Sequence, residues 1–129
     1  AQAFNPYKPQ FREAAAQLRL RRLPDELLLF QIPYNRIMMA YYLPAPLEPV
    51  VEAPYTNFRD AEGRVTVTPE NAAEQLQSLT QGYRQVWLVY SEAQLWDERE
   101  LVKSWLDAAG VVVYEQHFLM VSLICYRLG

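Results

Sequence analysis

The sequence predicts a single α/β domain with three layers, in which a mostly parallel sheet carries helices on both faces and ends in an antiparallel hairpin. Apolar runs of strand length alternate with helical patterns in the order α-β-α-β-α-β-α-β-β, and this alternation indicates parallel strands covered by helices. Only Leu119 and Met120 separate the last two apolar runs, so those two strands must be antiparallel. The 129 residues, 51% apolar and 21% charged, suit one globular core.

The first half of the chain predicts two helices and two strands after an extended N-terminal segment. Pro6 and Pro9 interrupt any periodicity, so residues 1–9 are expected to be extended ahead of a single domain at 10–129. The second helix is expected to turn Ile37, Met38, Tyr41 and Tyr42 inward. The expected elements of this half are a helix over 10–22, a strand over 27–32, a helix over 34–43 and a strand over 50–53.

The second half carries clearer start and stop signals. Thr68 can cap a helix whose first residue is Pro69, and Gly82 suits its left-handed end. Asp97 and Glu100 resemble a capping box, and Gly110 is expected to close the helix that follows. The expected elements are helices over 69–81 and 98–109 and strands over 86–90, 111–118 and 121–128.

Composition excludes several classes of function. The net charge is −3 with no long basic run, which disfavours non-specific nucleic-acid binding. The arginines at 19, 21 and 22 are interpreted as cations at a helix C-terminus. No apolar stretch approaches the roughly 20 residues that cross a bilayer. Cys125 lies between apolar neighbours and is interpreted as a buried core residue without a disulfide partner.

The chain offers few groups for catalysis or for holding a cofactor. The turns at 31–36 and 91–93 contain no glycine, so neither matches a phosphate-binding loop. His117 has no partner motif and is interpreted as a core-edge residue hydrogen-bonded to the backbone. The acidic residues Glu92, Asp97, Glu98 and Glu100 are interpreted as capping and solvated groups, with a weak Mg²⁺ or Ca²⁺ site as the alternative. No catalytic residue, metal or cofactor is therefore predicted.

A ligand, if one binds, is expected at the carboxyl ends of the parallel strands, near the point where the strand order reverses. Tyrosines 7, 34, 41, 42 and 55 could also rim a sugar-binding or protein-binding surface, although packing is the favoured interpretation. The residues expected at the strand ends are Tyr34, Asn35, Arg36, Thr56, Asn57, Ser91 and Glu92.

Several segments resemble the soluble C-terminal region of bacterial membrane glycosyltransferases related to protein mannosyltransferases and aminoarabinose transferases. The similar segments are 11–15 before the turn at Asp25, 41–43, Gly82–Tyr90, 101–106 and the tail from His117 to Leu128. The resemblance implies a Rossmann- or flavodoxin-like domain that follows the last membrane span on the extracytoplasmic face. The catalytic acidic residues of that family lie in loops between its membrane spans and have no counterpart here.

The resemblance thus implies a non-catalytic accessory domain of an enzyme that uses lipid-linked sugar donors. Its expected partners are the membrane-embedded part of the same polypeptide and a glycan or lipid-linked sugar, with no nucleic acid. The alternatives are a free-standing α/β module that binds a small metabolite or a protein, and a small enzyme of unknown type. The few catalytic groups disfavour the small enzyme.

Overall fold

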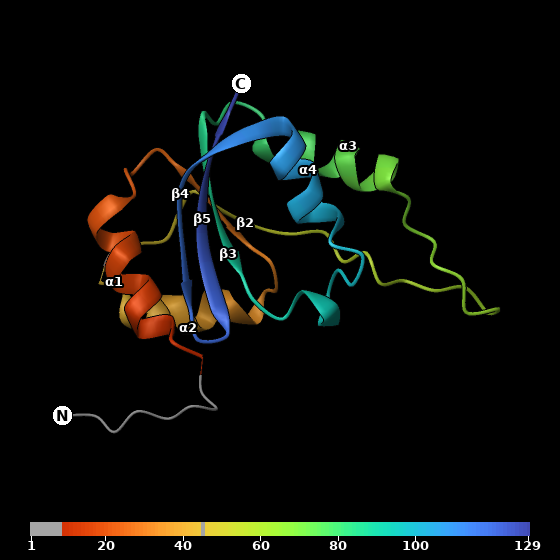
Figure 1. Ribbon diagram of the computed structural model, residues 1–129, viewed down its shortest axis with the longest axis horizontal. Helices are drawn as coiled ribbons and strands as arrows, with labels where there is room; N and C mark the ends of the chain where they lie inside the picture. Colours follow the sequence, from red (N-terminus) through yellow and green to blue (C-terminus); the bar gives the residue numbers. More distant parts are fainter. Residues whose placement is uncertain (1–8, 45) are drawn as a thin grey trace.

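The protein is built on a five-stranded sheet accompanied by four α-helices over the described residues (Figure 1). The computed structural model describes residues 9–44 and 46–129, so the extended segment predicted for 1–9 lies outside the described residues except for Pro9. The predicted α/β class and order of elements are confirmed. In chain order the elements are α1 (Phe11–Arg21), β1 (Leu27–Phe30), α2 (Tyr34–Tyr42), β2 (Val50–Glu52), α3 (Pro69–Thr80), β3 (Gln85–Tyr90), the 3-10 turn η1 (Ala93–Leu95), α4 (Leu101–Ala109), β4 (Gly110–Phe118) and β5 (Val121–Leu128).

The sheet is open and mixed, with the strand order β2-β1-β3-β5-β4. β1 is parallel to β2 and to β3, whereas β5 is antiparallel to β3 and to β4, so β5 alone runs against the other strands. The predicted C-terminal hairpin is confirmed, with Phe118 paired to Val121 and a two-residue turn between them. Met120 in that turn has a φ of 61°, the left-handed conformation that tight hairpin turns require.

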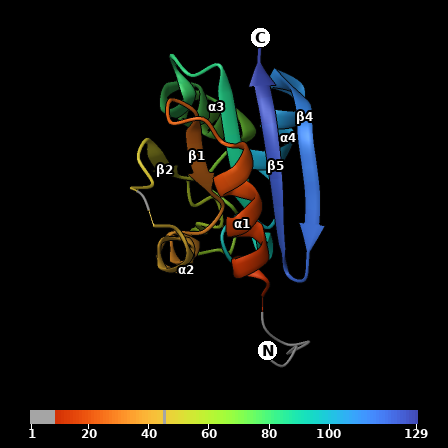
Figure 2. The same cartoon turned by 90° about the vertical axis from the view of Figure 1, so that its left-hand side faces the viewer.

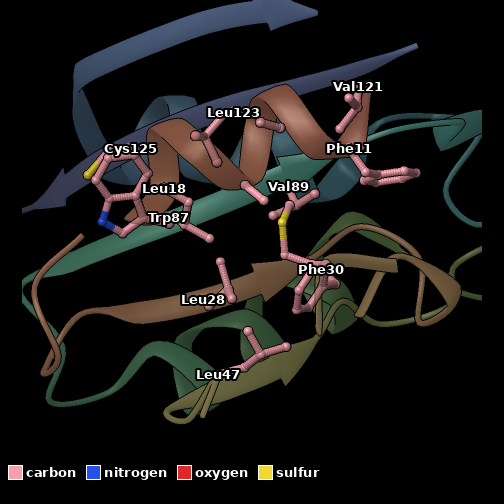
Figure 3. Close-up of a cluster of buried hydrophobic side chains, with 13 residues drawn as sticks. Phe11, Leu18, Leu28, Phe30, Leu47, Trp87, Val89, Val121, Leu123 and Cys125 are labelled. Carbon is pink, nitrogen blue, oxygen red and sulfur yellow. The ribbon is translucent and has the colours of Figure 1, made fainter. Parts of the chain in front are cut away.

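The side chains of the sheet belong to two hydrophobic clusters, because successive side chains of a strand point to opposite faces. Leu28 and Phe30 of β1, with Trp87 and Val89 of β3, pack against Phe11 and Leu18 of α1 and Met39 of α2 (Figure 3). The intervening residues of the same strands pack against α3 and α4. That second cluster contains Leu27, Leu29, Val86, Leu88, Leu76, Val102 and Leu106. Burial of every residue from Leu27 to Phe30 explains why this strand is a continuous apolar run.

The predicted inward face of α2 is right for Met38 and Tyr42 and wrong for Ile37 and Tyr41. Ile37 and Tyr41 are 68% and 81% exposed, while the buried residues of the helix are Asn35 and Met39. Met38 and Tyr42 are partly buried against the first cluster. Apolar residues surround this helix, so its sequence does not specify which stripe packs on the sheet.

The sequence signals for helix ends were correct at α3 and wrong at the start of α4. At α3, Thr68 Oγ1 accepts from the amide of Asn71 at 3.1 Å and Gly82 has a φ of 87°, as predicted. At α4, the predicted capping box does not form, because the helix begins at Leu101 and Glu100 lies before it with a φ of 54°. The carboxylate of Asp97 instead reaches forward to the amides of Leu101 and Val102, at 3.0 and 2.9 Å.

The helices of the described residues are short compared with a membrane span. Across residues 9–44 and 46–129, none of the helices has both the length and the apolar character needed to cross a bilayer. The longest, α3, has 12 residues.

Candidate functional site

The carboxyl ends of β1, β2 and β3 form the candidate site. The chain leaves β1 through α2 toward β2, on one side, and leaves β3 through α4 toward β4, on the other. The strand order therefore reverses between β1 and β3, which is where ligands bind in open α/β sheets. The seven predicted residues lie on the segments that leave these three strands.

The segment after β2 is hydrogen-bonded to the segment after β3. Thr56 Oγ1 donates to Asp97 Oδ1 at 2.5 Å, and both residues are fully buried. The amide of Thr56 donates to the carbonyl of Trp96 at 3.0 Å, and the Trp96 indole N–H donates to the carbonyl of Ala53 at 2.9 Å. Thr56 therefore holds two loops together, and its hydroxyl faces a protein carboxylate.

Asn57 and Arg99 extend the same connection. The Asn57 side chain donates to the carbonyl of Gln94 at 3.0 Å and accepts from the amide of Glu98 at 2.8 Å. One Arg99 nitrogen, Nη2, donates to the carbonyls of Thr56 and Val67, at 3.0 and 2.6 Å. The sequence analysis missed Arg99, because its acceptors are backbone carbonyls 32 and 43 residues away and leave no local signal.

The residues that follow β3 have mainly conformational roles. Ser91 is buried, and its hydroxyl donates to the carbonyl of Met120 at 2.8 Å, which joins the end of β3 to the β4–β5 turn. Glu92 has a φ of 49° at the start of η1. The Tyr90 hydroxyl donates to Glu100, and burial, followed by this hydrogen bond, raises the pKa of Tyr90 above its ordinary value.

The three predicted residues after β1 have different environments. Tyr34 is 60% exposed, and Arg36 forms ion pairs with Glu48 and Glu52, with N–O distances of 3.3 and 3.9 Å. Asn35 is only 1% exposed, and its Nδ2 has no hydrogen-bond partner within the described residues. Of these neighbours, Tyr34 is therefore accessible to solvent and Asn35 is buried.

Gln31 is a second residue of this site, besides Arg99, that the sequence did not single out. It follows β1 directly, is fully buried, and neither Oε1 nor Nε2 has a partner within residues 9–44 and 46–129. Its backbone amide donates to the carbonyl of Val89 at 3.0 Å, which fixes it between β1 and β3. A polar residue near the end of the apolar run 27–32 was the available signal. Buried polar side chains normally have partners, so Gln31 and Asn35 need an explanation.

The remaining candidate groups for catalysis lie on the hairpin. His117 is not a core-edge residue bonded to the backbone, as predicted, because its side chain is 64% exposed. Its Nδ1 lies 2.6 Å from Ser122 Oγ and its Nε2 lies 2.8 Å from Glu115 Oε2. Cys125 is buried as predicted, and burial raises the pKa of its thiol to about 12.

The acidic residues after β3 do not form a metal site in the described part of the chain. No three of the His, Cys, Asp and Glu side chains at 9–44 and 46–129 are placed to hold a metal ion. Asp97 accepts hydrogen bonds, and Glu98 forms an ion pair with Arg59. Asp97 therefore caps the start of α4, as interpreted, but it is fully buried and not solvated.

A cavity of about 400 Å³ is lined by none of the seven predicted residues, although one lining residue, Glu48, forms an ion pair with Arg36. It is formed by the end of α1 and by segments that precede β1 and β2, so it adjoins the amino ends of these strands. Its lining residues are Leu18, Arg19, Arg22, Leu23, Pro24, Leu43, Pro44, Pro46 and Glu48.

Comparison of the chain with models of protein families, with curated proteins and with solved structures found no match.

Proposed function

We propose that this chain is a non-catalytic accessory domain of a membrane glycosyltransferase that uses lipid-linked sugar donors. The domain lies at the extracytoplasmic face of the membrane and packs over, or positions an acceptor for, the membrane-embedded part of the same polypeptide. The fold is assigned as a three-layer, Rossmann- or flavodoxin-like domain. The two core clusters, one shared with α1 and α2 and the other with α3 and α4, support that assignment.

The hydrogen bonds at the carboxyl ends of the strands carry the non-catalytic part of this proposal. The Thr56 hydroxyl, the Asn57 amide and the Ser91 hydroxyl each bond to groups of the chain itself. A nucleophile needs an adjacent base to activate it. Ser91 instead donates to a backbone carbonyl, and the acceptor of Thr56 is a carboxylate that also binds two helix amides. These groups hold the loops in place.

The resemblance of 11–15, Gly82–Tyr90 and the tail from His117 supports the assignment to a membrane glycosyltransferase. Reading the gene upstream of the codon for Ala1 tests it. The proposal expects several apolar spans of about 20 residues. A start codon immediately before Ala1 would contradict it.

The non-catalytic role is tested in the whole membrane enzyme by sugar transfer from a lipid-linked donor. Arg36→Gln and Glu92→Gln alter charged groups near the strand ends, and neither side chain is buried. The turnover number is expected to stay within about two-fold of wild type for both variants. A loss of about 100-fold or more in either variant, with an unchanged melting temperature, would assign chemistry to this domain.

The buried amides of Gln31 and Asn35 favour a second candidate function, the binding of a small polar metabolite. Both residues lie where the strand order reverses, beside the N-terminus of α2, which has no side-chain cap. Gln31 Oε1 and Nε2 and Asn35 Nδ2 have no partner within the described residues, and such buried amide atoms are suited to orient the hydroxyl or phosphate oxygens of a ligand.

Titration with nucleotides and sugar phosphates, followed by amide NMR shifts, tests this second function. It expects saturable shifts at Gln31, Asn35 and Ser91, which Gln31→Leu abolishes. Unmoved shifts at these residues would remove it.

A further inference from the structure

β4 forms one edge of the sheet and lacks the short length, the prolines and the lysines that often protect an edge strand. Figure 2 shows β4 at the outer edge, and no other described segment lies along its outer side. It is nine residues long, so about 30 Å of backbone N–H and C=O groups face outward along that side. An edge strand of this kind is a template for pairing with another strand.

The opposite edge shows how this sheet is protected elsewhere. β2 has only three residues and is flanked by Pro49 and Pro54. A short strand beside prolines offers few free donors to a partner. β4 contains no proline and no lysine or arginine, and Glu115 is its only acidic residue.

The amino half of β4 presents apolar side chains to solvent. Val111, Val112 and Val113 are 59%, 41% and 43% exposed. A register shift between Val112 and Tyr114 leaves Val113 without a partner on β5. Such bulges twist a strand, but this one adds neither charge nor proline to the edge.

We propose that β4 pairs with β4 of a second copy of this chain, antiparallel and about a two-fold axis, to join the two sheets. A two-fold contact uses the same surface on both copies, so the strand must be compatible with itself. When the two strands overlap fully, Tyr114 lies opposite its own copy, Glu115 lies opposite Val113, and His117 lies opposite Val111. No like charges oppose each other in this register, and the charged Glu115 faces an apolar residue.

β4 has one acidic residue, Glu115, and no lysine or arginine. This composition favours a second copy of β4, rather than a highly charged strand, as its pairing partner. A partner rich in lysine or glutamate would leave most of its charges beside valines. A second β4 buries the valines of both copies and supplies hydrogen-bond partners to the free backbone groups of both β4 strands. The resulting dimer is closed, because each copy uses its β4 edge once.

Sedimentation equilibrium of the 129-residue chain tests the proposal. Between about 10 μM and about 1 mM, the weight-average mass is expected to rise from 15.1 kDa toward twice that value. Val113→Lys and Val111→Lys place a charge on the edge and are expected to weaken dimerisation about ten-fold or more. Ile37→Lys is the matched control, because Ile37 is 68% exposed on α2, which Figure 2 shows on the far side of the molecule from β4, and this variant should dimerise as wild type does.

Hydrogen exchange distinguishes the pairing from other contacts. The exchange of β4 amides in wild type should slow as the concentration rises, and in Val113→Lys it should not. A chain that stays monomeric throughout, a mass that grows beyond the dimer, or an equal loss of dimer in Ile37→Lys would each overturn the proposal.

Discussion

The Thr56 hydroxyl and the Asp97 carboxylate are 41 residues apart in sequence and are joined by a hydrogen bond of 2.5 Å in the interior of the protein. The same carboxylate accepts from the amides of Leu101 and Val102, so one buried side chain fixes the loop after β2 and the start of α4 together. A buried carboxylate is stable only when donors surround it. Asp97 is therefore the residue on which the geometry of the candidate site depends.

Thr56→Val tests that dependence. Valine keeps the shape of threonine but removes one of the donors to Asp97, so the free energy of unfolding is expected to fall by about 1–3 kcal/mol. Urea denaturation measures the change. Thr66→Val is the matched control, since Thr66 is exposed and its hydroxyl lies 3.4 Å from its acceptor, the carbonyl of Phe58. Equal stability of Thr56→Val and Thr66→Val would show that the bond to Asp97 contributes nothing.

Gly110→Ala is expected to destabilise the junction of α4 and β4. A Cβ at this position would lie 2.8 Å from the carbonyl oxygen of Arg127 and 2.9 Å from Leu128 Cδ2. Relieving this overlap requires backbone movement and costs about 1–3 kcal/mol. Gly129→Ala, where nothing lies within 4 Å, should leave the melting temperature unchanged. An unaltered melting temperature for Gly110→Ala would show that β5 can move away freely.

Gln31→Leu is expected to raise the free energy of unfolding by about 1–3 kcal/mol, because it replaces two unpartnered buried polar atoms with apolar ones of similar volume. Gln77→Leu on the exposed side of α3 provides the comparison and should change stability by less than about 0.5 kcal/mol. A destabilised Gln31→Leu would mean that the amide is hydrogen-bonded in solution.

The contact between Tyr126 and Asp107 predicts a pH dependence. The Tyr126 hydroxyl donates to Asp107 Oδ1 at 2.6 Å. Burial acts to raise the pKa of Asp107, but the hydrogen bonds from Tyr126 and Lys103 outweigh it and hold the pKa below its ordinary value. The stability from this contact is therefore fully present above the unfolded pKa of about 4 and is lost as the pH falls through the lower folded pKa.

Urea unfolding of wild type and Tyr126→Phe across the acid range measures this effect. The difference in stability between the two proteins should shrink below about pH 4. Tyr83→Phe, a half-buried tyrosine on the same cluster, should track the wild type. A Tyr126→Phe difference that is constant with pH would show that Asp107 is not coupled to the hydroxyl.

The sequence predicted those parts of the fold whose signals are local. Thr68, Pro69 and Gly82 bound α3 correctly because each acts on its own turn of backbone. The inward face of α2 could not be predicted, since apolar residues occur around the whole helix and only contact with the sheet selects Met39. Asp97 was predicted to cap a helix that begins at the next residue. Its carboxylate instead accepts from the amide of Leu101, four residues later, and this contact depends on the conformation of the loop between them.

The candidate site was predicted by position and not by role. Thr56, Asn57 and Ser91 lie on the segments that follow β2 and β3, but their hydrogen-bond partners lie 29 to 41 residues away and are set by the folded arrangement. Gln31 carried a signal, as a polar residue closing an apolar strand. Its lack of a partner depends on the packing around it and could not be read from the chain.

Turnover by the isolated chain tests the central claim most directly. The chain is incubated with radiolabelled lipid-linked sugars and nucleotide sugars, with peptide and glycan acceptors, and transferred label is counted. The account predicts no transfer above the level of a heat-denatured sample. Transfer that a single substitution such as Glu92→Gln abolishes, while the fold stays intact, would contradict it.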